Sequence, residues 1–122
     1  MSGSSLQQDE LDAAIKAATD AGFEVIRADA TTLLLDLDTA PALEQFARVL
    51  PLVKEKYWVT KVEKWSSKSG NTHVRISLQD EVAWPVRYAL QAALGSDGVR
   101  EVLACIQMQN GCQEASLLFK PT

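Results

Sequence analysis

The chain has 122 residues, of which 47% are hydrophobic, and a formal net charge of −4 at pH 7. This length suits one domain with a single core, and no segment approaches the roughly 18 consecutive apolar residues that a membrane span requires. The negative charge argues against a general nucleic-acid coat protein, because neutralising phosphates takes a surplus of Lys and Arg.

The N-terminus and the cysteines indicate the cellular setting. Residues 1–8 are polar and lack the basic and apolar regions of a signal peptide. We therefore expect them to be disordered, followed by one α+β domain over residues 9–122, in the cytoplasm. Cys105 and Cys112 form no CxxC pair and His73 is the single histidine, which rules out a structural zinc site. We expect both cysteines to be reduced thiols.

The first part of the chain predicts a helix and two strands. Apolar residues recur every three or four positions over Asp9–Ala21, and Gly22 follows as a C-cap. Phe23–Arg27 and Thr32–Asp38 are typical of strands. The turn at Ala28–Thr31 between them favours a hairpin.

The middle of the chain predicts a helix and a second hairpin. Thr39 is suited to the N-cap of the helix, and Pro51 either kinks or ends it. Tyr57–Ser66 and Thr72–Leu78 favour two strands, joined by the turn-rich residues 67–71.

The C-terminal part predicts two helices and a last strand. The first helix covers Trp84–Leu94 and is closed by Gly95. The second covers about Gly98–Met108, with Ser96 as its N-cap, and Ala115–Phe119 favours a strand.

From Thr32 onward the predicted order is βαββαβ, the order of a ferredoxin-like or RRM-like sandwich, here preceded by an extra helix and strand. In that topology the first and third strands are antiparallel neighbours, so the end of Thr32–Asp38 lies beside the start of Thr72–Leu78. Side chains alternate between the two faces of a strand. One face contacts the helices, and the other is expected to be open. The open face carries Asp36, Asp38, His73, Arg75 and Ser77.

These residues suit a divalent cation and phosphates. Asp36 and Asp38 are about 6 to 7 Å apart along the strand and can supply oxygen ligands to one or two Mg²⁺ or Mn²⁺ ions. Paired ions stabilise the attacking and leaving oxygens of nucleotidyl transfer. The turn before His73 offers backbone N–H groups and small side chains to a phosphate. His73 would hydrogen-bond a phosphate, and Arg75 would hold its charge.

Two motifs resemble the archaeo-eukaryotic primase-polymerase superfamily. Its motif I, a strand of the form hhhDhD, here is Leu33-Leu34-Leu35-Asp36-Leu37-Asp38. Its motif II, S-x-S-G-x-x-H-V, here is Ser67-Lys68-Ser69-Gly70-Asn71-Thr72-His73-Val74. Residues 90–101 and 117–121 are similar to small phage proteins that share this core, so the resemblance covers roughly residues 32 to 121.

The resemblance implies a phage-type domain in DNA replication, in the host cytoplasm, that binds Mg²⁺ or Mn²⁺ and a nucleotide or nucleic acid. A host or phage replication protein would be its partner. Catalysis is assigned to Asp36, Asp38 and His73. The third acidic ligand of the family has no clear motif here, and of two candidates, Asp97 and Glu114, we assign Asp97 to the metal site with Asp36 and Asp38. Phosphate binding is assigned to Ser67, Lys68, Ser69, Gly70, Asn71 and Arg75.

Two other functions stay open. The same sheet face could belong to a non-catalytic module that binds single-stranded nucleic acid or a host protein. A lysine-rich segment over residues 54–68, interleaved with Tyr57, Trp58 and Trp65, is compatible with this, although a solvated strand is the simpler interpretation. The sheet face or an edge strand could also pair two copies of the chain. We expect Trp58, Trp65 and Trp84 to lie in the core or at its margin.

Overall fold

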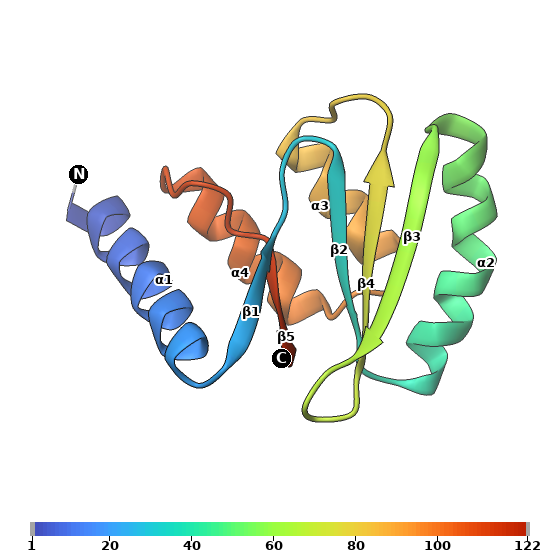
Figure 1. The fold of residues 1–122 in the computed structure, drawn as a ribbon. Coiled ribbons are helices and arrows are strands. Elements are labelled where there is room, and N and C mark those ends of the chain that lie inside the picture. The colour runs from blue at the N-terminus through green and yellow to red at the C-terminus, as the bar shows by residue number, and fades with distance from the viewer. Residues whose placement is uncertain (1, 122) are drawn as a thin grey trace.

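The computed structural model describes residues 2–121 and has an α+β architecture (Figure 1). Its elements in chain order are α1 (Ser2–Asp20), β1 (Phe23–Arg27), β2 (Thr32–Leu37), α2 (Ala40–Lys56), β3 (Val59–Ser66), β4 (Thr72–Leu78), α3 (Trp84–Ala93), α4 (Gly98–Gln109) and β5 (Leu117–Pro121). The strands within the described range form two antiparallel sheets, with the orders β2–β4–β3 and β1–β5. The predicted class is therefore confirmed, as a ferredoxin-like α+β fold preceded by one helix and one strand.

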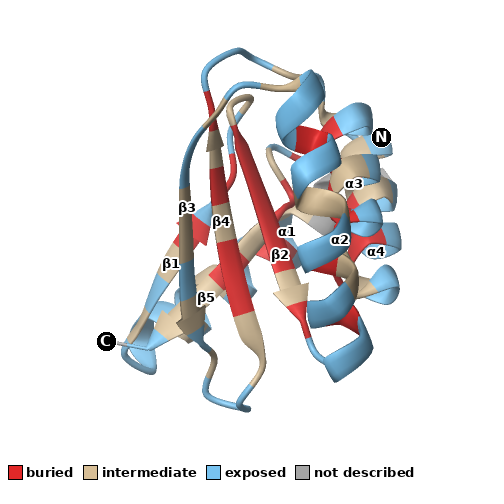
Figure 2. Ribbon diagram, turned by 90° about the vertical axis from the view of Figure 1, so that its right-hand side faces the viewer, coloured by how far each residue is buried: buried red, intermediate tan, exposed pale blue. Residues whose placement is uncertain are grey.

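The main core lies between the β2–β4–β3 sheet and the helices on one side of it (Figure 2). Alternate residues of β2 and β4 point into this core and are almost completely buried: Leu33, Leu35, Leu37, Val74, Ile76 and Leu78. Phe46 and Val53 of α2 meet them from the helix layer. Burying a side chain of this size contributes about 1.5 to 3 kcal/mol. The alternation seen in the sequence therefore determines which face of each strand is inside.

Helix α2 continues through its proline. It starts at an N-cap, Thr39, whose hydroxyl accepts the N–H of Ala42 at 3.1 Å. Pro51 lies inside the helix, which ends only after Lys56. Proline removes a helical hydrogen bond. However, Phe46 before it and Val53 after it are buried in the same core, and this packing holds both halves of the helix.

Strand β1 pairs with β5 and not with β2, so the predicted hairpin is wrong. The two strands form a separate antiparallel ribbon in which Ile26 lies opposite Leu118. The segment between β1 and β2 has no glycine for a tight two-residue hairpin turn. Instead, the Asp29 carboxylate accepts hydrogen bonds from the Thr31 N–H (2.9 Å) and from the hydroxyls of Thr31 and Thr32. This wider turn does not align β1 beside β2.

Side chains, and not a neighbouring strand, form the hydrogen bonds to the backbone groups on the outer edge of β2. The Leu34 N–H donates to Gln91 Oε1 at 3.0 Å, and the Asp36 N–H donates to Ser96 Oγ at 3.0 Å. Arg100 bridges the two sheets, because it donates to the carbonyl of Leu34 at 3.3 Å and to that of Leu117 at 3.1 Å. The strand ladder between β2 and β5 is thus replaced by side-chain hydrogen bonds.

These side chains belong to one buried polar network. Its members are Gln91, Ser96, Arg100, Glu101 and Ser116. Glu101 is its centre, since its carboxylate accepts from Gln91 Nε2 at 2.5 Å and from Ser96 Oγ at 2.8 Å and forms an ion pair with Arg100. Ser96 was expected to be a helix N-cap. It is drawn into the network instead, and Asp97 caps α4.

The sheet face predicted to be open is partly covered, which corrects that expectation. A second apolar cluster lies on it, where Leu34 and Trp65 of the larger sheet meet residues of the ribbon, namely Ile26, Ala28 and Leu118. Leu34 is completely buried, and His73 is only 8% exposed. The extra strand β1 is the physical reason, because it joins β5 in a ribbon with an apolar side that this face buries.

Helix α1 covers Ser2–Asp20, and the disorder expected for residues 1–8 stays a prediction. The side chain of Gln8 anchors this helix. It donates to Asp12 Oδ1 at 3.0 Å and accepts from the Gln113 N–H at 2.9 Å, so it ties the helix to the loop after α4. Within the described part of the chain, none of the helices has both the length and the apolar character needed to cross a membrane.

Candidate functional site

Asp36, His73 and Trp65 lie side by side across three strands. Asp36 of β2 is directly opposite His73 of β4, which in turn is opposite Trp65 of β3. Asp36 Oδ1 is 3.4 Å from His73 Nε2 and 3.4 Å from Asn71 Nδ2. The rings of Trp65 and His73 meet edge to face, 5.8 Å apart. The topology predicted from the sequence therefore places the aspartate and the histidine together.

The surroundings of Asp36 favour its ionised form. The hydrogen bond with His73 is the main cause and lowers the pKa of the Asp36 carboxyl below its usual range. The charges of His73 and Arg100 and the hydrogen bond from Asn71 act in the same direction, against the opposing effect of partial burial. Asp36 is thus a carboxylate at neutral pH, as an oxygen ligand for a cation must be.

This lowered pKa predicts a specific acid sensitivity. A carboxyl group with a lower pKa in the folded state stabilises the fold above its unfolded pKa, about 3.9, and that stabilisation is lost as the pH falls through the folded value. We expect wild type to lose part of its free energy of unfolding relative to Asp36→Asn as the pH falls below about 4. Urea unfolding of both proteins from neutral pH to about pH 2.5 measures this. A difference between them that stays constant over that range would contradict it.

The turn that precedes His73 is a compact loop held by its own hydrogen bonds. The Ser67 N–H donates to the Asn71 carbonyl at 2.8 Å, and the Asn71 N–H donates to Ser67 Oγ at 3.0 Å. Gly70 has a φ of +91°, in the left-handed region that favours glycine. The hydroxyls of Ser67 and Ser69 are 3.0 Å apart. The turn therefore presents two hydroxyls and a lysine, Lys68, beside Asp36.

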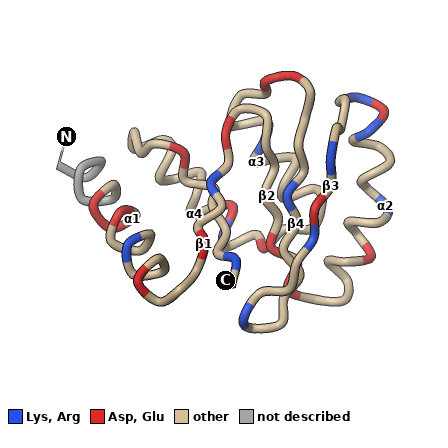
Figure 3. The backbone as a smooth tube through the Cα atoms, in the orientation of Figure 1, with Lys and Arg blue, Asp and Glu red and all other residues tan. Residues whose placement is uncertain are grey.

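A hollow of about 340 Å³ lies between this turn and the ribbon. Its lining combines polar residues of β2, β4 and the turn with two aromatic rings of the ribbon: Phe23, Asp36, Ser67, Lys68, Ser69, Asn71, His73 and Phe119. Lys68 Nζ lies 5.8 Å from the centre of the Phe23 ring, and Lys120 Nζ lies 5.5 Å from that of Trp65. Figure 3 shows basic residues on the turn and near the C-terminus, in contrast to the mainly acidic α1. The hollow is thus a small pocket whose lining includes one lysine, Lys68, and one carboxylate, Asp36.

Phe23 and Phe119 of this lining were missed in the sequence, because they come from the ribbon whose pairing was not predicted. Their only sequence signal is the aromatic residue near the start of β1 and the Phe-Lys pair of β5.

Arg75 does not contact Asp36. It lies opposite Glu63 of β3 and donates to both of its carboxylate oxygens, at 2.9 and 3.1 Å. This two-point ion pair is the geometry that arginine and carboxylate prefer, and it raises the pKa of Arg75 while lowering that of Glu63. The Arg75 guanidinium, which the sequence analysis assigned to phosphate binding, is therefore paired with Glu63 instead.

The other two predicted metal ligands lie outside the hollow. Asp38 is exposed just beyond the end of β2 and lines an adjoining hollow of about 210 Å³, which also includes Gly70 and Asn71. Asp97 caps α4, where its carboxylate accepts the N–H of Val99 at 3.1 Å. Its backbone N–H donates to the carbonyl of Asp36 at 2.9 Å. The backbone of Asp97 therefore contacts that of Asp36, whereas its carboxylate caps the N-terminus of α4.

Glu114, the other candidate for a third acid, is occupied elsewhere. It forms an ion pair with Arg87 at 2.6 Å and accepts a hydrogen bond from Tyr88. Within residues 2–121, no three His, Cys, Asp or Glu side chains are grouped so that they could hold a metal ion together. A cation in the hollow would thus take most of its ligands from water and from a bound phosphate.

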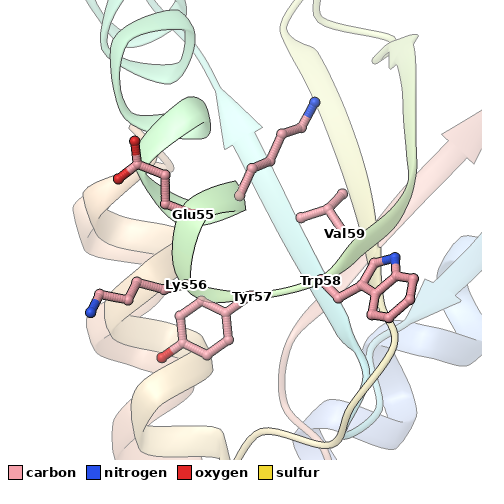
Figure 4. Close-up of a pocket in the computed structure, with 6 residues that line it drawn as sticks. Glu55, Lys56, Tyr57, Trp58 and Val59 are labelled. Carbon is pink, nitrogen blue, oxygen red and sulfur yellow. The ribbon is translucent and has the colours of Figure 1, made fainter.

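The lysines of the 54–68 segment do not form one surface. Lys54 and Lys56 border a separate hollow of about 440 Å³ where α2 meets β3 (Figure 4). It lies at the far end of β3 from Trp65, the residue opposite His73. Trp58 lies there and is 71% exposed, so its predicted place in the core or at its margin is wrong. Lys64 lies over the Phe46 ring at 5.1 Å, and Lys68 is on the turn. These charges are spread over both ends of the sheet.

Among the described residues, two buried polar atoms near the hollow have no hydrogen-bond partner. They are Trp65 Nε1 and His73 Nδ1. Unmatched polar atoms are uncommon in protein interiors, and here they belong to His73, which contacts Asp36, and to Trp65, whose ring meets that of His73.

Comparison with models of protein families, with curated proteins and with solved structures gives no match. The function must therefore be inferred from the side chains around Asp36.

Proposed function

We propose that the hollow beside Asp36 binds the phosphates of a nucleotide together with a Mg²⁺ or Mn²⁺ ion, as a phage-type domain of the primase-polymerase kind would in DNA replication. The observation that carries this proposal is the cluster of Asp36, His73 and Asn71 beside the serine-rich turn. An ionised carboxylate, hydroxyls and a lysine at one small pocket match the ligands of a cation and a phosphate chain.

Each group has a distinct task in this proposal. Asp36 supplies an oxygen to the cation, whose other ligands are water and phosphate oxygens. Ser67, Ser69 and Lys68 hold the phosphates. His73 keeps Asp36 in place through their 3.4 Å contact. The aromatic wall from the ribbon offers a surface on which a base can stack.

Nucleotidyl transfer makes a further demand on the site. It uses two ions about 4 Å apart, held by shared carboxylates. Asp38 is the acid available for this, since its exposed side chain adjoins the hollow across Asn71. Binding requires Asp36 alone, whereas transfer requires both aspartates, so the two activities can be separated by mutation.

Calorimetry of the wild-type protein with a nucleoside triphosphate and Mn²⁺ tests the proposal. We expect heat of binding with Mn²⁺ and an affinity at least about tenfold lower, roughly 1.4 kcal/mol, for Asp36→Asn. Asp80→Asn is the matched control, because Asp80 is an exposed aspartate that follows β4 at the end opposite His73. Its affinity should equal that of wild type.

An absence of heat with wild type, or equal affinities for Asp36→Asn and wild type, would contradict the proposal. A titration with a labelled oligonucleotide at two salt concentrations examines the non-catalytic alternative. Binding that needs no divalent ion and weakens steeply with salt would favour a nucleic-acid-binding module instead.

A further inference from the structure

Helix α4 turns its apolar residues toward solvent and its charges toward the interior. Val99, Val102, Leu103 and Ile106 are between 42% and 68% exposed. The only charged residues of the helix, Arg100 and Glu101, belong to the buried polar network. A surface helix normally has the opposite arrangement, with polar residues outward. The outer face of α4 is therefore an apolar stripe, defined by these four residues.

The polar network forces this arrangement. Arg100 and Glu101 must face inward to hydrogen-bond the edge of β2 and its neighbours. Residues on the other side of the helix then face outward, whatever their polarity. A sequence with no further role for this face would place polar residues there at no cost to the core. A contiguous exposed apolar patch usually marks an interaction site.

We infer that the apolar stripe of α4 is the contact surface of a homodimer. The spacing of its residues, 99, 102, 103 and 106, is symmetric about its own midpoint. A two-fold axis through that midpoint brings Val99 of one copy against Ile106 of the other, and Val102 against Leu103. Each contact then joins a smaller and a larger side chain. Self-complementarity of this kind is what a two-fold interface requires.

Charge also favours a second copy as the partner. The stripe carries no charged side chain, so two copies meet without repulsion between like charges. The chain as a whole has a net charge of −4, and α1, which contacts α4, is rich in acidic residues (Figure 3). Two copies therefore repel each other least where they meet through an uncharged face.

The apolar surface continues beside the stripe. A hollow of about 390 Å³ adjoins α4 and is lined in part by Leu11, Ala14, Leu103, Leu117 and Phe119. Side chains of the second copy can enter it. Stable interfaces bury about 800 Å² on each partner, which one 12-residue helix does not supply by itself. The dimer is thus expected to dissociate in the micromolar range, roughly −8 kcal/mol.

Sedimentation of the full chain over a range of concentrations tests this inference. We expect the mass of wild type to rise from that of one chain toward twice that value. The double variant Val102→Glu with Leu103→Glu should remain a single chain throughout. Leu52→Glu is the matched control, since Leu52 of α2 is 59% exposed and lies outside the stripe. It should dimerise like wild type. Circular dichroism of each variant establishes that it is folded.

Three outcomes would overturn the inference. Wild type that stays a single chain up to about 0.5 mM, well above a micromolar Kd, would leave the stripe to a different protein. A dimer that survives the double glutamate variant would place the interface elsewhere. Equal loss of the dimer in Leu52→Glu would show a general effect of charge. None of these results depends on nucleotide binding. The dimer inference is therefore tested independently of the proposed function.

Discussion

Glu101→Ala is expected to lower the free energy of unfolding by about 3 to 5 kcal/mol, the usual cost of breaking a buried ion pair. Glu101 is buried and accepts hydrogen bonds from Gln91 and Ser96 in addition to its pair with Arg100. Its removal leaves these donors without an acceptor. It also releases the side chains that satisfy the Leu34 N–H and the Asp36 N–H of β2. Urea unfolding followed by circular dichroism measures the loss.

Two further variants sharpen this prediction. Glu44→Ala, at an exposed position of α2, should change stability by less than about 0.5 kcal/mol. Replacing a buried ion pair by apolar residues is often harmless, yet Arg100→Met with Glu101→Leu should stay strongly destabilised. The carbonyls of Leu34 and Leu117 would lose their donor. Wild-type stability in that double variant would show that the network contributes little.

Leu34→Ala is expected to cost about 3 kcal/mol, within the range found for leucines in closed cores. Leu34 points to the sheet face opposite the main core, where the ribbon and Trp65 enclose it completely. If that face were open, the same substitution would cost less than about 1 kcal/mol. The measurement therefore decides whether the ribbon covers the sheet in solution.

Leu52→Ala provides the scale for this comparison. Leu52 is an exposed leucine in a helix, so its truncation should change the free energy of unfolding by less than about 0.5 kcal/mol. Equal effects of Leu34→Ala and Leu52→Ala would contradict the covered face.

Local patterns predicted the larger sheet well. The alternation of leucines in β2 and of Val74, Ile76 and Leu78 in β4 is a property of each strand alone, and βαββαβ topology then placed His73 beside Asp36. The pairing of β1 was not accessible in this way. The pairing of β1 depends on which strand edge is free after the buried polar network has hydrogen-bonded the outer edge of β2. A local sequence pattern does not contain that information.

In the candidate site, too, the neighbours that strand order determines were predicted, whereas the partners of individual side chains were not. Asp36, His73 and the Ser67–Asn71 turn were predicted as neighbours because adjacent strands carry them. Arg75 was assigned to phosphate, but Glu63 lies directly opposite it and offers a better partner. Asp97 was assigned to a metal, but its place before the first turn of α4 gives its carboxylate a backbone N–H to accept.

The ribbon also sets an order of events in the life of the chain. Phe23 pairs with Pro121, which comes much later in the sequence, so β1 has no partner until β5 has been synthesised. Contacts between such distant segments form late and slowly. Until then the nascent domain exposes Leu34 and Trp65, a surface that chaperones recognise and that aggregation exploits. Covering of that surface therefore has to wait until β5 is available to pair with β1.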